Sequence, residues 1–304
     1  MTGCREMIID PVAREMLEAE LSPERLLCTT RRGGNEVYTF TAAECPWLMR
    51  EVGRLREEAF RAAGGGTGRS VDIDADDRAV GGYRQLIVWD PAAREIVGGY
   101  RYIICRGERP RHLSTEHYFR FSERFRRNFL PRTIELGRSF VQVSYQVRNN
   151  PKSICALDNL WDGLGAVVRR NPQVRYLFGK VTVYASCKRA ARDMLFYFLR
   201  RFFPDREHLV TARRPLEDGS GGCDFEALFS GSTYEENYRI LVRKIREYDE
   251  RIPPMISSYM RLSPTMRVFD TVANPDFGGV EETGIMLTIP DIYPDLRARY
   301  ITAE

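Results

Sequence analysis

The sequence predicts an α/β (α+β) protein with a mixed central sheet flanked by helices, on three observations. Two apolar runs, Arg84–Trp89 and Ile96–Cys105, are separated by a DPAARE turn, which predicts an antiparallel hairpin. Later runs of strand character alternate with helical patterns, which places helices on the faces of the sheet. A chain of 304 residues, 43% of them hydrophobic, is long enough to bury a substantial core.

The segment before the hairpin is expected to be mainly helical. Asp10-Pro11 and Ser22-Pro23 each place a capping side chain before a proline, which predicts two helix starts. A longer helix is expected over Cys45–Ala63, because apolar residues recur there at helical spacing. Gly64–Gly68 then predicts a loop.

Strands and helices alternate after the hairpin. The basic and aromatic span 106–131 predicts a helix with loops. Strands are expected over Thr133–Val143 and Val174–Ala185, and each is followed by a helical pattern, Leu157–Arg170 and Lys188–Phe203. We therefore expect both strands to lie in the sheet that contains the hairpin.

The remaining sequence predicts an insertion, a helix and two more strands. The insertion spans 205–231, the charged helix Tyr234–Arg251, and the strands Arg267–Val272 and Thr283–Ile289. We divide the chain into a core over 1–204, an insertion and helix over 205–251, and a C-terminal extension over 252–304 whose strands complete the fold.

Composition excludes several classes of protein. The longest uninterrupted apolar run, Met194–Leu199, is far shorter than the about 20 residues that a membrane-spanning helix needs. The seven cysteines are an odd number without a CxxC pair, which disfavours a disulfide framework and a zinc site. The first residues lack the pattern of a signal peptide, so a cytoplasmic location is expected.

Two stretches imitate ligand-binding loops without their key residues. Gly64–Ser70 is like a phosphate loop but has no lysine, and Asp72–Asp77 starts like a calcium loop but lacks its glycine and final glutamate. The three histidines occur in no metal or triad motif. We therefore expect no metal, and no nucleic-acid partner, because a nucleic-acid-reading module is also missing.

Positive charge is concentrated in one segment. Only four of the 46 basic residues are lysine, so arginine supplies nearly all of the positive charge. Residues 101–148 contain eleven arginines against four glutamates. Guanidinium groups bind phosphate and carboxylate through two hydrogen bonds at once, which favours an anionic partner. A general compositional bias toward arginine is the alternative interpretation.

Glu135 and Arg138 are candidate site residues in the strand Thr133–Val143. Residues an even number of positions apart share one face of a strand, whereas these two are three apart. A β-bulge or a strand end would let both face one site. A surface ion pair is the alternative.

The run Glu135–Ser139 (ELGRS) resembles the E-L-x-R signature of acyl-homoserine-lactone synthases and of the related ornithine-lipid and glycine-lipid N-acyltransferases, also labelled hemolysins. Other segments resemble that family in the same order, namely Arg56–Phe60, Asp72–Asp77, Gln85–Asp90, Gly98–Arg101, Pro253–Leu262 and Asp276–Gly278. Lactone synthases lack the C-terminal segments. The runs Glu135–Gln142 and Asp158–Gly165 are most similar to the glycine-lipid branch from Bacteroidales.

This resemblance implies the fold of the GCN5-related N-acetyltransferases and an N-acyltransferase activity. The implied reaction transfers a long-chain (3-hydroxy)acyl group from acyl carrier protein to the α-amine of an amino acid in aminolipid biosynthesis, with glycine favoured and ornithine next. No tightly bound cofactor is implied, because the acyl-phosphopantetheine of the carrier protein is the donor. A lipid product also implies possible peripheral contact with the inner membrane, for which Arg200–Phe203 is the candidate segment.

Two sequence features bear on the donor. Ordinary acetyltransferases hold the coenzyme A pyrophosphate at a helix N-terminus, in a glycine-containing loop. That loop is missing between Phe140 and Leu157, which favours acyl carrier protein over coenzyme A. Carrier proteins are acidic, so the arginine-rich span 101–148 could steer them to the site.

The resemblance also assigns roles to residues. Glu135 is the candidate base for the acceptor amine, directly or through a water. Arg138 and Arg101 would orient Glu135 or bind the carboxylate of the amino acid. Other substrate contacts are expected near the acceptor amine, at the thioester oxyanion and along the acyl chain. They are Asp74, Asp77, Arg56, Phe60, Phe140, Val141, Val143 and Trp161.

Two other functions stay open at this stage. One is an acyltransferase of the same fold that uses acetyl-CoA or another acyl-CoA, which the missing pyrophosphate loop disfavours. The other is a membrane-active, hemolysin-like protein, which should carry an exposed apolar hairpin or a strongly amphipathic helix. The sequence shows neither clearly.

Overall fold

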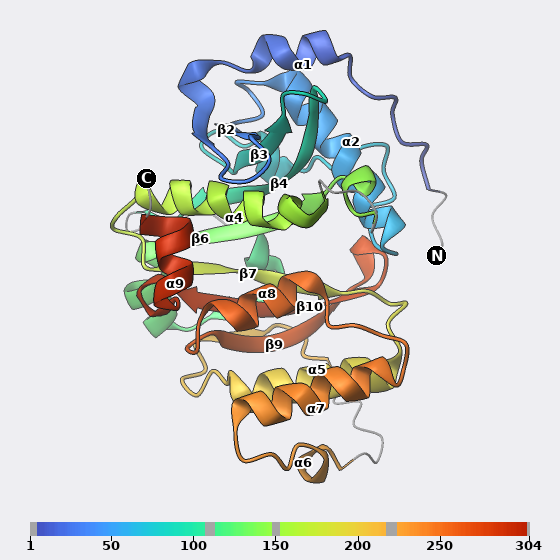
Figure 1. Cartoon of the computed structure of the whole chain (residues 1–304), viewed down its shortest axis with the longest axis vertical. Coiled ribbons are helices and arrows are strands. Elements are labelled where there is room, and N and C mark those ends of the chain that lie inside the picture. Colours follow the sequence, from blue (N-terminus) through green and yellow to red (C-terminus); the bar gives the residue numbers. More distant parts are fainter. Residues whose placement is uncertain (1–4, 107–112, 148–152, 217–223, 303–304) are drawn as a thin grey trace.

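The computed structural model describes residues 5–106, 113–147, 153–216 and 224–302. In these ranges a mixed sheet of eight strands forms the centre of the molecule, in the order β1-β2-β3-β4-β6-β7-β10-β9 (Figure 1). The strands are β1 (Leu26–Thr29), β2 (Glu36–Phe40), β3 (Arg84–Asp90), β4 (Glu95–Ile104), β6 (Thr133–Val141), β7 (Tyr176–Val183), β9 (Arg267–Asn274) and β10 (Val280–Thr288). Neighbouring strands are antiparallel except β6 and β7, which are parallel.

Helices cover both faces of this sheet, which confirms the predicted fold class. Side chains alternate between the faces along β3. Ile87 and Trp89 pack in one core under α2 (Pro46–Ala62), whereas Leu86 and Val88 pack in the other core under α4 (Ser153–Arg169). In Figure 1, α4 crosses in front of β4 and β6.

Further helices pack around the β9 end of the sheet. Beyond β9, α5 (Arg189–Phe202) and α7 (Tyr234–Arg246) lie side by side (Figure 1). Helix α8 (Pro254–Leu262) packs beside α4, where the rings of Trp161 and Tyr259 meet edge to face with centroids 5.5 Å apart. The short elements are α1 (Arg14–Glu20), α3 (Ala75–Arg78), α6 (Phe225–Leu228) and α9 (Pro294–Arg297), together with a small sheet of β5 (Phe119–Phe121) and β8 (Val210–Ala212).

Most of the predicted elements are present. The structure confirms the helix α2, the hairpin of β3 and β4, the alternation of β6, α4, β7 and α5, and the final strands β9 and β10. The predicted helix with loops over 106–131 consists instead of short turns, the strand β5 and a π-helical segment at Phe125–Phe129. The predicted insertion is tied to that segment, because β8 pairs with β5.

The first predicted N-terminal helix start was wrong, and the second begins only a short 3₁₀ helix. Asp10-Pro11 lies in extended chain, where the N–H of Val12 donates to the carboxylate of Glu51 on α2, and α1 starts only at Arg14. Ser22-Pro23 starts a single 3₁₀ turn that leads into β1. The strands β1 and β2 were not predicted, because four- and five-residue strands depend on tertiary pairing more than on local propensity.

The candidate membrane segment lies at the end of α5. Phe203 is buried, and its ring packs against that of Tyr234 at a centroid distance of 5.7 Å. Much of the apolar surface there is thus used by the contact between α5 and α7. Of the helices within the described ranges, none is long and apolar enough to cross a membrane.

Candidate active site

The strands β6 and β7 separate halfway along their length. They pair from Thr133 with Tyr176 as far as Leu136 with Gly179, after which β6 stays bonded to β4 and β7 to β10. Glycine is needed at this last pair, because a Cβ on Gly179 would lie 2.6 Å from the carbonyl oxygen of Leu136. The separation opens a gap inside the sheet, and a pocket occupies it.

A β-bulge in β6 shapes one wall of this gap. Arg101 on β4 is opposite Gly137, whereas Gly99 is opposite Phe140, so β6 has one more residue than β4 over this stretch. Arg138 lies in the bulge, and its backbone is in the left-handed conformation with φ of +50°. The bulge that sequence analysis considered is therefore present, and it turns Arg138 toward the acidic residues that Arg101 contacts.

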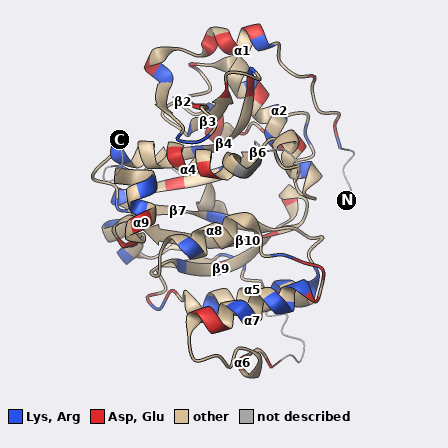
Figure 2. Ribbon diagram, in the orientation of Figure 1, with Lys and Arg blue, Asp and Glu red and all other residues tan. Residues whose placement is uncertain are grey.

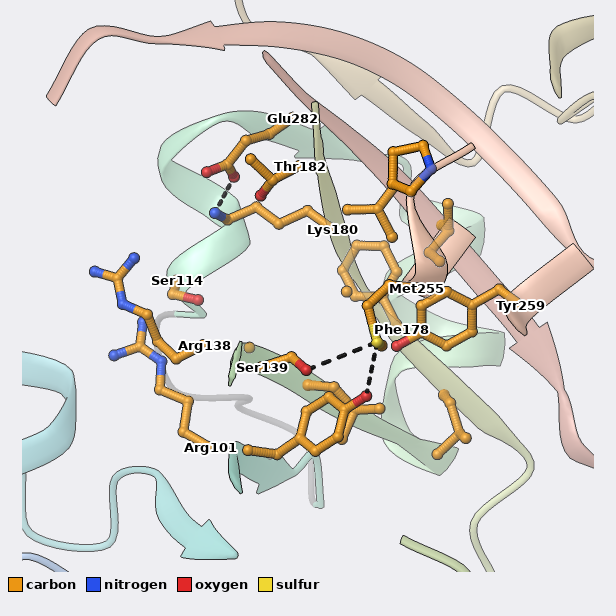
Figure 3. Close-up of a pocket in the computed structure, with 18 of the residues that line it drawn as sticks. Arg101, Ser114, Arg138, Ser139, Phe178, Lys180, Thr182, Met255, Tyr259 and Glu282 are labelled. Atoms are coloured by element: carbon orange, nitrogen blue, oxygen red, sulfur yellow. Dashed lines mark hydrogen bonds and ion pairs between the residues drawn. The ribbon is translucent and has the colours of Figure 1, made fainter. Parts of the chain in front are cut away.

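The pocket has two chemically different halves (Figure 3). The polar half is lined by Arg101, Ser114, Arg138, Lys180, Thr182 and Glu282. The apolar half is lined by Tyr100, Leu136, Leu177, Val181, Met255, Tyr259, Ile285 and Leu287. Because Lys180 and Thr182 alternate with Val181 along β7, the halves open on opposite faces of the sheet and meet in the gap.

Helix α8 closes the apolar half. Its Met255 sulfur accepts long hydrogen bonds from the hydroxyls of Tyr100 and Ser139, at 3.7 and 3.8 Å (Figure 3). The side chain of Met255 therefore lies directly across the gap from β4 and β6. Methionine is flexible and adapts its shape to its neighbours, so this wall can move aside for an apolar ligand.

Glu135 lies behind the pocket wall. Its side chain is fully buried, and its carboxylate accepts hydrogen bonds from the hydroxyls of Tyr83 and Ser114, each at 2.8 Å, and from the hydroxyl and N–H of Thr115. Burial raises the pKa of Glu135, although these hydrogen bonds and Arg101 partly offset the rise. Ser114 lines the pocket and Glu135 does not. The predicted base thus reaches the pocket through the Ser114 hydroxyl.

Arg56 and Asp77 form a fully buried ion pair under α2. The guanidinium lies 3.3 Å from both carboxylate oxygens, and the Gln85 amide bridges the pair by accepting from Arg56 and donating to Asp77. Burial alone would raise the pKa of Asp77, but Arg56 and Arg101 outweigh it and hold this pKa below its usual range. Both residues support the site without lining the pocket.

Arg101 and Arg138 extend this network to the pocket. Arg101 lies 2.6 Å from Asp74 and 3.4 Å from Asp77, and its guanidinium covers the ring of Tyr83. The Arg138 guanidinium lies 3.0 Å from Asp72 and 3.6 Å from Asp74. Asp74 and Asp77 therefore face arginines, and their predicted contact with the acceptor amine stays a prediction.

Of the other predicted residues, only Phe60 lines the pocket. The part of β6 that lines it ends at Ser139, so Phe140, Val141 and Val143 lie beyond the wall. Trp161 lies behind Tyr259 and donates its indole N–H to Ser258, at 3.0 Å. Their expected roles at the oxyanion and the acyl chain stay predictions.

The polar half also contains a buried ion pair that no sequence motif predicted. The Lys180 ammonium contacts the Glu282 carboxylate, whose other oxygen accepts from the side-chain amide of Asn274 at 2.8 Å. Burial, together with Arg138 and Arg101, holds the pKa of Lys180 well below its usual value. A signal was present in the sequence, because Lys180 interrupts an otherwise apolar strand on the face that Phe178 and Thr182 share.

The chemistry of the pocket suits direct transfer between two bound molecules. Neither cysteine nor histidine occurs among its described lining residues. The described residues also include no cluster of three or more His, Cys, Asp or Glu that could hold a metal ion. What the pocket does provide is an apolar half for a hydrocarbon chain, a charged half for a small polar molecule, and a gap where they meet.

Comparisons with known proteins show what this chain is similar to. Residues 55–156 match the family model described as acetyltransferase (GNAT) domain. The chain is 50% identical over 302 residues to the glycine N(alpha)-acyltransferase of Bacteroides thetaiotaomicron, covering 97% of this chain and 90% of that protein. It is 47% identical over 304 residues to the glycine N(alpha)-acyltransferase of Phocaeicola vulgatus, covering 97% and 93%. A crystal structure of the AHL synthase LasI aligns with a TM-score of 0.33 and 17% identity, over 55% of this chain and 79% of that chain.

The buried network generates a prediction about stability. Asp77→Asn leaves the Arg56 charge buried without its counterion, so we expect the free energy of unfolding to fall by about 3–5 kcal/mol at pH 7 in urea titrations. Asp76→Asn is the control, because Asp76 is partly exposed and 3.8 Å from Arg101.

Wild type and Asp77→Asn also test how the contribution of Asp77 to stability depends on pH. The pKa of Asp77 is lower in the folded state, so its contribution is present above its unfolded pKa of about 3.9 and is lost as the pH falls toward the folded value. The difference in stability between wild type and Asp77→Asn should therefore shrink below about pH 4. A difference that stayed constant from pH 7 to pH 3 would contradict this assignment.

Proposed function

This chain belongs to the glycine N(alpha)-acyltransferase family, and we propose that it transfers a long-chain (3-hydroxy)acyl group from acyl carrier protein to the α-amine of glycine. Its class as an acyltransferase with a GNAT domain is shown by its relatives and by the family model. The family that the sequence motifs predicted is thereby confirmed. The acceptor, the donor and the place in aminolipid biosynthesis are the proposed parts.

The two-sided pocket is the observation that carries this proposal. An acyl chain fits the apolar half, where Leu136, Val181 and Met255 remove hydrocarbon from water. A zwitterionic amino acid fits the polar half, where Arg101 and Arg138 can attract its carboxylate. The thioester carbonyl then lies in the gap, within reach of an amine that approaches from the opposite face of the sheet.

The gap also offers a way to stabilise the transition state. Beyond Leu136, β6 no longer pairs with β7, so backbone groups on that edge face the pocket instead of another strand. N–H groups there can bind the oxyanion that forms when the amine attacks the thioester. The hydroxyl of Ser114, bonded to Glu135, provides a route by which the attacking nitrogen loses its proton.

Glycine is favoured over ornithine as the acceptor because both similar proteins are named for glycine. The polar half holds charged groups of both signs, including Lys180 and Glu282, which suits a zwitterion. The aminolipid pathway is supported by the apolar half, because a short acetyl group would leave that surface unfilled.

Two features support acyl carrier protein as the donor. They are the missing pyrophosphate loop and the positive charge on the protein surface. The segment between β6 and α4 includes residues 148–152, which lie outside the described residues. Arg101 and Arg138 lie inward, in the pocket wall and the network behind it, so 101–148 is not one continuous exposed basic surface. Figure 2 shows basic residues gathered along α5 and α7, which could attract an acidic carrier. Peripheral membrane contact remains part of the proposal.

An endpoint assay by mass spectrometry tests the reaction. Purified protein is mixed with 3-hydroxypalmitoyl carrier protein and a pool of amino acids that includes glycine and ornithine, with 3-hydroxypalmitoyl-CoA as the donor in a parallel tube. We expect N-acylglycine from the carrier-protein tube. Product from acyl-CoA alone would replace the proposed donor, and N-acylornithine would replace the acceptor. Dye leakage from vesicles without any donor would favour the hemolysin-like alternative.

The proton route generates a second test. We expect Glu135→Gln and Ser114→Ala each to lower kcat by about 10²-fold, because both interrupt the same path from the nitrogen. The double variant should then be little slower than either single variant, since members of one route are not additive. Thermal unfolding of each variant controls for stability. If Glu135→Gln retained wild-type turnover, Glu135 would not be the base.

A further inference from the structure

We propose that Lys180 is the general acid that protonates the sulfur atom of the departing thiol, and that Glu282 positions it. This inference rests on the proposed acyl transfer and adds a second proton-transfer residue to it. It concerns a buried ion pair to which neither the sequence motifs nor the base route through Ser114 gives a role.

The position of Lys180 places it beside the reacting bond. It follows Gly179, the last residue of β7 that pairs with β6, so its side chain leaves the strand where the gap begins. Figure 3 shows its ammonium on the polar side of the pocket, beside Glu282. The side chain is 14% exposed, and Lys180 is among the residues that line the pocket. A thioester that passes through the gap therefore comes close to this ammonium group.

Neighbouring groups hold the ammonium in place without using all of its protons. An ammonium has three N–H donors, and the ion pair with Glu282 uses one. The ring of Tyr118 lies 5.0 Å from the Lys180 nitrogen and adds a cation–π contact. Glu282 is itself fixed, because it is 1% exposed and accepts a hydrogen bond from Asn274. The remaining donors can point into the pocket.

The surroundings of Lys180 favour proton transfer from its ammonium group to a sulfur leaving group. Burial and the nearby Arg138 and Arg101 lower its pKa well below that of an exposed lysine. A lowered pKa makes the ammonium a stronger acid and therefore a better proton donor to the departing sulfur.

The step balances in atoms and charge. The acceptor ammonium first gives one proton to solvent, which leaves a neutral amine. The lone pair of this amine forms the C–N bond and the carbonyl becomes an oxyanion, whose collapse breaks the C–S bond. The nitrogen loses one proton through Ser114 to Glu135, and the sulfur takes one proton from Lys180. The products are an amide and a thiol, and exchange of one proton with solvent at each residue restores the enzyme.

Binding of the amino acid carboxylate is the other role that an ammonium could have here. Arg101 and Arg138 line the same half and present guanidinium groups, which bind carboxylates through two hydrogen bonds. Lys180 and both arginines are paired with carboxylates, so charge alone does not separate them. Lys180 differs in its place directly after Gly179, where the gap that the thioester would occupy begins. These observations favour the sulfur as the partner of Lys180.

A change of leaving atom separates the two roles. Carrier protein is loaded with 3-hydroxypalmitoyl phosphopantetheine or with its selenium analogue, whose selenol is a much stronger acid and leaves without a proton. For Lys180→Met we expect kcat to fall by about 10²-fold with the thioester and by less than tenfold with the selenoester. Lys180→Arg should behave in the same way, because guanidinium retains the charge but does not give up a proton.

Two further measurements exclude a merely structural role. The kcat of the wild type should decline as the pH rises and Lys180 loses its proton, and this decline should be absent in Lys180→Met. Arg14→Met is the control, since the exposed Arg14 pairs with Glu95, away from the pocket and from α5 and α7, and should retain wild-type kcat with both donors. Glu282→Gln should lower kcat with the thioester more than with the selenoester.

Three results would overturn the proposal. These are equal losses of kcat with both donors, a pH profile that Lys180→Met leaves unchanged, or a rise in KM for glycine with kcat preserved, which would assign Lys180 to the carboxylate. If instead the wild type formed no N-acylglycine from either donor, the proposed function itself would have failed. That outcome is distinguishable because it precedes any comparison of variants.

Discussion

The site depends on one constraint, which is that β6 and β7 stop pairing after Leu136 and Gly179. Each strand keeps its other neighbour, so the sheet remains whole on both sides while a gap opens within it. The backbone edges along the gap lose their usual partners and become available to a ligand. The two faces of the sheet, which the strands otherwise separate, are connected at this gap.

Buried charges near this gap impose a second constraint on the structure. Arg56 and Arg101 are almost completely buried and therefore need acidic partners, which the segment around α3 supplies. Arg101 in turn covers the ring of Tyr83, whose hydroxyl holds Glu135. A residue of the pocket wall is thus linked to the proposed base by rigid contacts, which fixes the polar half before any substrate binds.

The C-terminal segment is far from β4, β6 and β7 in the sequence, and it completes the pocket that they line. Met255 and Tyr259 come from α8, and Glu282 comes from β10, yet all three face residues of β4, β6 or β7. The apolar half therefore needs this segment, which agrees with matches that cover 97% of the chain rather than the GNAT domain alone. The proposed general acid needs it as well, because the partner of Lys180 comes from β10.

The sequence by itself determined the long helices, the β3–β4 hairpin, the alternating strands and the family, because apolar periodicity and ordered motifs are local properties. It also indicated Glu135 and Arg138 as candidates for one site if the strand carried a bulge, and the structure contains that bulge at Arg138. Only the tertiary structure decided that Glu135 lies behind Ser114 and that Lys180 meets Glu282. Lys180 and Glu282 are far apart in the sequence, and they lie close together because β7 and β10 are neighbours in the sheet, with Glu282 opposite Thr182 and Gly284 opposite Lys180. Such contacts depend on strand order and burial, which no local pattern of residues specifies.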